Sequence, residues 1–292
     1  MRCNYPQSRW IDGAKVYYPC GHCNACMVNR RNEKAVRGYL ESRSHTDNCF
    51  LTLTYNDDNI PRNSKGIPTL RRSEFDDFIK RLRSTYVREN FRVLACGEYS
   101  PYPAFRPHYH CCLFGVSMQD IVSHTGHYHR NSGGIICEDF RGWFNSKGEV
   151  KGGVEVAPFS FKTASYVAKY LVKRTDKPDY EFLNIEPQFI YQSRRPALGY
   201  EFARQHREQL LADGFIRLNG HKFPIPRSII ERVLDKDSDD VACLKMRFNE
   251  KRQEKERKFN KELQHIYKGS SKHYFEQLKE VAEQNEIHLK GK

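Results

Sequence analysis

The chain has 292 residues, a formal net charge of +13, a pI near 9.2 and 13% aromatic residues. This length suffices for one large domain or two smaller ones, each with a hydrophobic core. No apolar run approaches the roughly 20 residues that span a membrane, and the first residues lack the apolar core of a signal peptide. We therefore expect a soluble, non-exported protein.

The positive charge is unevenly distributed along the chain. From residue 227 onward there are 16 Lys and Arg and 13 Asp and Glu, a surplus of 3, which leaves +10 for residues 1–226. A basic excess attracts phosphate-rich partners such as nucleic acids. The alternative, a basic protein without a nucleic-acid partner, is not excluded by the charge alone.

The first part of the chain predicts two helices and a strand. Residues 29–43 are polar and basic and predict a helix. Residues 49–55, "CFLTLTY", are β-branched, aromatic and apolar, which is typical of a buried strand. Residues 73–86 carry an apolar stripe at helical spacing and predict a helix with Ser73 as its N-cap.

The next segments predict more strands and another helix. Residues 91–99 and 108–116 predict two strands, and the turn signals in "SPYPAFRP" between them favour antiparallel neighbours. After a loop-rich stretch, residues 153–159 predict a fourth strand. Residues 160–174 contain no Gly or Pro and predict a helix.

The order of these elements predicts the fold class. Strand, helix, strand, strand, strand and helix indicate an α+β fold, with an antiparallel sheet and helices on one face, resembling a ferredoxin-like or RRM-like core. The sequence then becomes highly charged and is expected to form a helical tail. We divide the chain into a cysteine-rich segment (1–48), a main domain (49–227) and the tail (228–292).

The stretch "HYH" at the start of the third strand suggests a metal site. Side chains alternate across a strand, so His108 and His110 point to the same face. Glu98 ends the preceding strand and lies nearby, although the register that decides its face is not set by the sequence. Two imidazoles and a carboxylate leave coordination positions open, and the histidines favour a first-row ion such as Mn²⁺ over Mg²⁺. An ordinary strand end is the alternative.

Two tyrosines in "SYVAKYLVK" are candidate nucleophiles. Tyr166 and Tyr170 lie four residues apart, on one face of the predicted helix, and Lys169 and Lys173 repeat that spacing on an adjacent stripe. A phenol with a pKa near 10 is a weak nucleophile unless a nearby cation favours the phenolate. A packing pair of aromatic side chains is the alternative.

A cysteine turn precedes the first predicted helix. Cys20, Cys23 and Cys26 form C-x-x-C-x-x-C, and Cys3 lies upstream as a candidate fourth ligand. Structural Zn²⁺ sites use such spacing. Free thiols and an iron–sulfur cluster are the alternatives. Other cysteines occupy apolar runs, which fits a reducing compartment. A zinc ion here would anchor the basic segment that includes Arg30 and Arg31.

These motifs together resemble a known superfamily. "FLTLTY", then "GEYSPYPAFRPHYH", then "SYVAKYLVK" resemble the three ordered motifs of HUH endonucleases, which initiate rolling-circle replication. The paired tyrosines, the "PCGHCNAC" run and the "SRRPALGY" segment resemble the replication initiators of microviruses, in particular the gokushovirus branch. The resemblance covers roughly residues 16–227.

The resemblance implies roles for individual residues. His108, His110 and Glu98 become the ligands of a divalent metal, Mn²⁺ or Mg²⁺. Tyr166 and Tyr170 become nucleophiles, and Lys169 becomes a phosphate-orienting or acid–base residue. Residues expected to contact DNA are Arg30, Arg31, Arg106 and Lys173.

The implied function is metal-dependent nicking and rejoining of origin DNA through a 5′-phosphotyrosine, in the cytoplasm of a bacterial host. The partners would be single-stranded and supercoiled origin DNA and the host replication machinery, including a helicase, because no P-loop motif occurs in the sequence. A plasmid relaxase or an HUH transposase is the alternative within the same chemistry. A non-catalytic single-stranded DNA-binding protein is the alternative from another class.

Overall fold

The computed structural model describes residues 3–11, 14–86, 90–101, 104–169, 179–218, 220–234 and 242–268. The chain divides into two compact units. Unit 1 comprises Met1–Arg30, Arg207–Ile225 and Leu234–Lys292, and unit 2 comprises Arg31–His206 and Pro226–Val233. The cysteine turn and the charged C-terminal part therefore belong to one unit. No helix among the described residues is long and apolar enough to cross a membrane.

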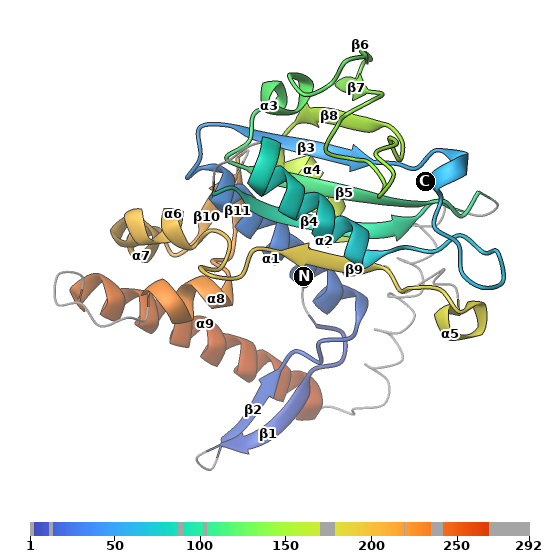
Figure 1. Ribbon diagram of the computed structural model, residues 1–292. Helices are drawn as coiled ribbons and strands as arrows, with labels where there is room; N and C mark the ends of the chain where they lie inside the picture. The colour runs from blue at the N-terminus through green and yellow to red at the C-terminus, as the bar shows by residue number, and fades with distance from the viewer. Residues whose placement is uncertain are drawn as a thin grey trace. The chain divides into compact units, whose positions relative to one another are not determined.

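Unit 2 is built on an antiparallel sheet of seven strands in the order β6-β7-β8-β3-β5-β4-β9 (Figure 1). The strands are β3 (Asn48–Leu53), β4 (Arg92–Tyr99), β5 (Pro107–Phe114), β6 (Tyr128–Arg130), β7 (Ile135–Cys137), β8 (Val154–Pro158) and β9 (Phe189–Gln192). The antiparallel α+β fold and the pairing of β4 with β5 are thus confirmed. The short strands β6, β7 and β9 were not predicted from the sequence.

Helices accompany the sheet. The longer ones are α1 (Asn24–Ser42), which begins in unit 1, α2 (Arg72–Arg81) and α4 (Phe161–Lys169). The short ones are α3 (Met118–Val122), α5 (Tyr180–Leu183), α6 (Tyr200–Gln205) and α8 (Arg227–Ile229), and single turns of 3₁₀ or π-helix occur at Asp57–Asn59, Leu82–Tyr86 and Ile230–Leu234.

Both faces of the sheet are covered, so the prediction of helices on one face is wrong. Phe75 and Phe78 of α2 pack on the face that carries Tyr109. On the opposite face lies α4 (Figure 1), and its Val167 belongs to the same apolar cluster as Cys112. The reason is that β4 and β5 are buried along nearly their whole length, and a strand with two apolar faces needs cover on both.

The start of α2 also differs from the prediction. The helix begins at Arg72 and its N-cap is Arg71, whose side chain forms no capping hydrogen bond. Ser73 lies inside the first turn. The Glu186 Oε2 instead accepts a hydrogen bond from the backbone N–H of Arg72 at 2.9 Å. A carboxylate distant in the sequence therefore replaces the local cap and complements the helix dipole.

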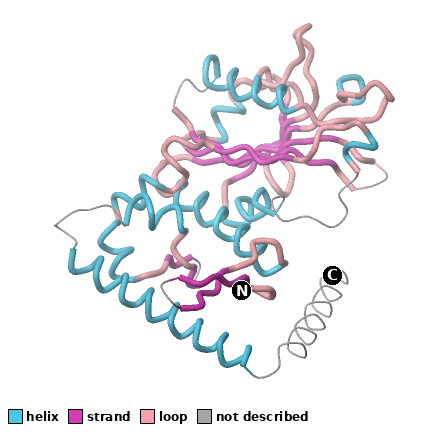
Figure 2. The backbone as a smooth tube through the Cα atoms, turned by 90° about the horizontal axis from the view of Figure 1, so that it is seen from below, coloured by secondary structure: helices cyan, strands magenta, loops and turns pink. Residues whose placement is uncertain are grey.

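Besides the start of α1, the described residues of unit 1 form two hairpins and two helices. The strands are β1 (Gln7–Ile11), β2 (Ala14–Tyr18), β10 (Ile216–Leu218) and β11 (His221–Phe223), and the helices are α7 (Arg207–Asp213) and α9 (Ala242–Lys268). The β1–β2 hairpin lies beside α9 (Figure 2). The prediction of a helical tail is confirmed for α9. Unit 1 accordingly combines described segments from the N-terminal and C-terminal parts of the chain.

Candidate metal and nucleophile site

Three ligand side chains meet on one face of the sheet. The register of β4 with β5 places Glu98 opposite His108 and Cys96 opposite His110. The nearest carboxylate and imidazole atoms of the three residues all lie within 4.8 Å of one another. Glu98 Oε1 is 2.9 Å from Nε2 of both His108 and His110. The structure thus brings together the metal set expected from the sequence, on the face covered by α4.

The opposite ring nitrogens of both histidines are held by neighbours. The Nδ1 of His108 lies 3.0 Å from the carbonyl oxygen of Arg106, which can only accept, so this nitrogen carries the proton. The Nδ1 of His110 lies 3.1 Å from Oγ1 of Thr52 in β3. Such outer contacts orient the two rings so that both Nε2 atoms face the point where a metal would lie. Thr52 is a neighbour of this candidate site that sequence reasoning missed.

The His110 Nε2 is buried and forms no hydrogen bond among the described residues, because its 2.9 Å approach to Glu98 lacks hydrogen-bond geometry. A buried polar atom without a partner is costly. This nitrogen and the Glu98 carboxylate both face the point where a cation would sit. The residues present therefore fit a divalent metal.

The electrostatics support the same conclusion. Glu98 is only 2% exposed, and burial raises its pKa, but the contacts with the two imidazoles outweigh burial and bring the pKa to about 2. Burial lowers the pKa of His110. At neutral pH the site therefore offers a carboxylate and a neutral imidazole, the protonation states that metal binding requires.

Tyr166 of α4 lies directly over the ligand set. Its hydroxyl donates to Glu98 Oε1 at 3.1 Å, and its ring packs edge-on against His110 at 4.8 Å. The side chain is nevertheless 40% exposed, because the buried stripe of α4 is formed by Ala164, Val167 and Ala168. The helix packs through its small residues and leaves the phenol at the surface.

A small apolar hollow of about 310 Å³ opens beside Tyr166. It is lined by Phe50, His110, Lys162, Thr163 and Tyr166. Phe50 stacks on the His110 ring with a centroid distance of 5.7 Å. A hollow with aromatic walls and one lysine at its margin suits a base of a single-stranded nucleic acid.

The remaining predicted residues are placed as follows. Lys169 is exposed at the end of α4, whereas Tyr170 and Lys173 lie outside the described residues. The guanidinium of Arg106 donates to Asp57 Oδ1 and, at 2.8 Å, to the carbonyl oxygen of Tyr55.

The basic residues of α1 fall into two groups. Arg30 is exposed and Arg31 half-buried. Arg37, further along the helix, is buried and donates to the carbonyl oxygen of Leu198 at 3.2 Å. Arg37 therefore stabilises the fold and offers no contact surface to DNA.

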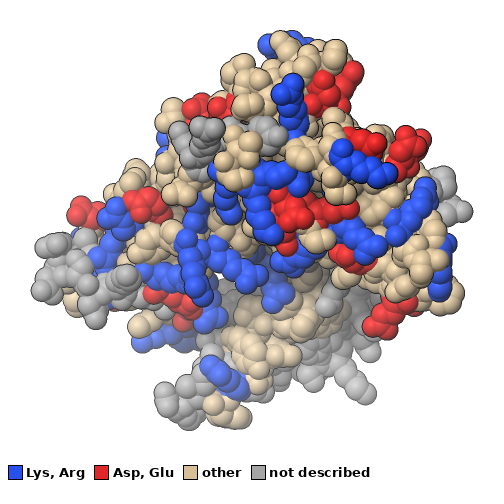
Figure 3. Space-filling view, in the orientation of Figure 1, with Lys and Arg blue, Asp and Glu red and all other residues tan. Residues whose placement is uncertain are grey.

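A groove rich in arginine follows the β9 edge of the sheet. It has a volume of about 900 Å³ and is lined by Arg72, Arg83, Asn90, Phe91, Arg92, Ile190, Tyr191, Gln192, Ser193, Arg194 and Arg195. None of these described lining residues is acidic. Lys and Arg side chains gather on the face that shows α2 and β9 (Figure 3). This arginine groove was not predicted from the sequence.

Comparisons with known proteins identify relatives of this chain. The family model for replication-associated proteins of the ORF2 type matches residues 48–175, which include β3, β4, β5 and α4. No solved structure matches the chain.

Three curated relatives are phage proteins. The replication-associated protein VP4 of Bdellovibrio phage phiMH2K is 32% identical over 73% of this chain and 66% of its own length. Replication-associated protein ORF2 of Spiroplasma virus 4 is 26% identical over 77% of this chain and 70% of its own. Replication-associated protein ORF4 of Chlamydia phage 1 is 24% identical over 76% and 55%. The chain belongs to the family of phage replication-associated proteins of the microvirus type.

Proposed function

We propose that this protein initiates rolling-circle replication of a circular single-stranded DNA phage genome by nicking and rejoining origin DNA. The observation that carries the proposal is the position of Tyr166: the residue is 40% exposed, and its hydroxyl lies 3.1 Å from the carboxylate of the Glu98, His108 and His110 set. A nucleophile must be accessible to DNA and adjacent to the group that activates the phosphate.

The proposed reaction is a transfer of the phosphodiester to tyrosine. A divalent cation, Mn²⁺ or Mg²⁺, held by Glu98, His108 and His110 would polarise a phosphate oxygen. Glu98 accepts the hydrogen bond of the Tyr166 hydroxyl and so orients its oxygen toward phosphorus. As the Tyr Oη–P bond forms, the phenol releases its proton to solvent and the P–O3′ bond breaks. The departing O3′ takes up a proton from solvent or from Lys169, giving a 5′-phosphotyrosine and a free 3′-hydroxyl. Attack by a 3′-hydroxyl on this linkage reverses the reaction and rejoins the strand.

The second tyrosine and the lysine complete the proposal. Tyr170 would cut again while Tyr166 still holds the first DNA end, and Lys169 would orient the phosphate or exchange the proton. The DNA contacts proposed beyond the cut site are Arg30, Arg31, Arg106, Lys173 and the arginine groove. Unwinding of supercoiled origin DNA is assigned to a host helicase, in the bacterial cytoplasm.

The test is a covalent adduct on a denaturing gel, formed with labelled single-stranded phage origin DNA and Mn²⁺. A label at the 3′ end of the DNA should stay with the protein, whereas a label at the 5′ end should be released on a fragment that a polymerase can extend. The variants are Tyr166→Phe, Tyr170→Phe and the double variant. Tyr128→Phe is the matched control, because Tyr128 is 53% exposed on the distant strand β6.

Each outcome separates the alternatives. An adduct lost only in the double variant supports two competent nucleophiles, and one lost in Tyr166→Phe alone supports a single nucleophile. Cleavage confined to a plasmid transfer origin or a transposon end would favour a relaxase or transposase. Tight DNA binding without any adduct would support the non-catalytic binding protein and overturn the proposal.

A further inference from the structure

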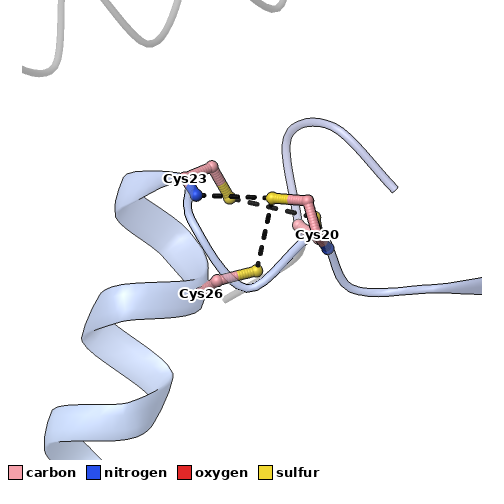
Figure 4. A group of neighbouring side chains, drawn as sticks. Cys20, Cys23 and Cys26 are labelled. Atoms are coloured by element: carbon pink, nitrogen blue, oxygen red, sulfur yellow. Dashed lines mark hydrogen bonds between the residues drawn. The ribbon is translucent and has the colours of Figure 1, made fainter. Parts of the chain in front are cut away.

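Four cysteines of unit 1 converge on one point, separate from the ligand set in unit 2. Cys3 precedes β1. Cys20 and Cys23 lie in the turn after β2, and Cys26 lies in the first turn of α1 (Figure 4). Their sulfurs all lie within 4.8 Å of one another, and none of the four forms a disulfide. The segment between Cys3 and Cys20 is the β1–β2 hairpin, so the cluster ties both ends of the hairpin to α1.

The distances between the sulfurs match a tetrahedral metal site. The Sγ atoms of Cys3 and Cys23 are 3.8 Å apart, and those of Cys20 and Cys26 are 4.0 Å apart. A disulfide requires about 2.05 Å. Four thiolates at the usual Zn–S distance of about 2.3 Å lie about 3.8 Å from one another at the corners of a tetrahedron. An iron–sulfur cluster surrounds a core of several atoms and holds its sulfurs further apart.

Backbone N–H groups are directed at the sulfurs. The N–H groups of His22 and Cys23 donate to Cys20 Sγ at 3.4 and 3.3 Å. Cys20 N–H donates to Cys3 Sγ at 3.2 Å, and Asn4 N–H donates to Cys23 Sγ at 3.4 Å. A thiol is a weak acceptor, whereas a thiolate accepts strongly, so these four donors favour the charged form.

Two local features direct positive charge toward the cluster. Gly21 has φ = +78°, a left-handed conformation that glycine adopts without strain and that turns the following N–H groups toward Cys20. Cys23 and Cys26 lie at the N-terminus of the 19-residue helix α1, where the helix dipole favours negative charge. A Cβ placed on Gly21 would lie 3.6 Å from Nη2 of Arg30, so a cation also lies beside this turn.

We propose that Cys3, Cys20, Cys23 and Cys26 bind one structural Zn²⁺ as thiolates. Four soft ligands in a closed tetrahedron suit zinc and leave no position for a substrate. The Zn²⁺ fixes the β1–β2 hairpin to the start of α1. Zn²⁺ with four thiolates carries a net charge of −2, and Arg30 balances part of it. This site and the proposed nicking site are independent, because they use different ligands in different units.

The test measures metal directly in the full-length chain, purified under reducing conditions after growth with zinc. We expect one Zn²⁺ per chain in the wild type and none in the Cys20→Ser/Cys26→Ser variant. The matched control Cys243→Ser removes an exposed cysteine outside the cluster and should retain the ion. A His108→Ala/His110→Ala variant should also retain it, which excludes zinc bound at the other site.

A second measurement uses the wild-type chain and does not depend on the folding of a variant. Titration with an organomercurial should release one Zn²⁺ as four thiols react, and Co²⁺ exchanged into the protein should show thiolate-to-metal charge transfer. Zinc retained by the Cys20→Ser/Cys26→Ser variant, release without thiol titration, or iron with inorganic sulfide in place of zinc would each overturn the proposal. None of these readouts depends on nicking, so failure of the zinc site and failure of the proposed activity are distinguishable.

Discussion

Replacing Thr52 with valine isolates the outer shell of the proposed metal site. The change removes the hydroxyl that lies 3.1 Å from His110 Nδ1, and it keeps a β-branched side chain suited to strand β3. Loss of one hydrogen bond lowers the free energy of unfolding by about 1 kcal/mol, which a domain of this size tolerates. Loss of an outer-shell contact to a metal-bound histidine lowers metal affinity by roughly 10- to 100-fold, or about 1.4–2.8 kcal/mol.

The assay is the Mn²⁺ dependence of adduct formation. In Thr52→Val the Mn²⁺ concentration for half-maximal adduct should rise by about 10- to 100-fold, while the rate at saturating Mn²⁺ stays near that of the wild type. Thr54→Val is the control, because the Thr54 hydroxyl donates to the carbonyl oxygen of Gly153. A Thr52→Val protein with an unchanged Mn²⁺ requirement would refute the idea that Thr52 orients His110.

Three further predictions address the ligand set, the arginine groove and the pH dependence of stability. Glu98→Gln keeps the shape of the side chain but removes its charge. Adduct formation at the Mn²⁺ concentration used for the wild type should therefore fall by more than the roughly 100-fold expected of an outer-shell change. Wild-type adduct formation in this variant would contradict a role for Glu98 as a metal ligand. The double variant Arg83→Gln/Arg194→Gln should lower the slope of log affinity for single-stranded DNA against log salt concentration by about 1.4, if each arginine contacts one phosphate. Two Arg→Gln changes outside the groove should leave this slope unchanged. The same slope in the wild type and in the groove variant would exclude the groove as a DNA contact. Burial, with a contribution from nearby Arg37, lowers the pKa of Lys34 from 10.5 to about 8. Between pH 8 and 10.5 the unfolded chain therefore binds more protons than the folded chain, and the free energy of unfolding should rise with pH across that range. Urea denaturation should show this rise in the wild type relative to Lys34→Gln, and a difference that does not vary with pH would contradict it.

The sequence predicted the central strands and the ligand types because their signals are local. The apolar runs of β3, β4 and β5 and the alternation in "HYH" depend only on neighbouring residues. The face of Glu98 depended on the β4–β5 register, which is set by the connection between the strands and by packing on both faces. The structure pairs Glu98 with His108 and so decides a point that the sequence left open.

Other features depended on contacts between distant segments. The cap of α2 comes from Glu186, more than 110 residues away, and the serine signal near the start of the helix was misleading for that reason. Thr52 acquires its role only when β3 lies beside β5, where its register partner is His110. The edge strand β9 is four residues long, too short for a period-2 pattern to identify.

The packing of α4 leads to a last prediction, which separates the nucleophile from the metal ligands. Ala164 is fully buried. A Cβ added at Gly38 of α1 would lie 3.5 Å from the Cβ of Ala164. The close approach of α1 and α4 through small residues therefore sets the height of Tyr166 above Glu98. Ala164→Leu overpacks this contact, which costs about 1–3 kcal/mol in stability, and it should displace α4 while β4 and β5 keep the ligand set in place.

A displacement of about 1 Å can lower a rate by about 100-fold. In Ala164→Leu the rate of adduct formation at saturating Mn²⁺ should therefore fall, while the Mn²⁺ concentration for half-maximal adduct stays unchanged, the opposite of the Thr52→Val result. A variant with a lower melting temperature but a wild-type rate would show that Tyr166 reaches the phosphate without the packing of α4. A changed Mn²⁺ requirement in Thr52→Val and a changed rate in Ala164→Leu would support separate roles for the two elements: the sheet holds the metal ligands, and α4 positions the attacking oxygen.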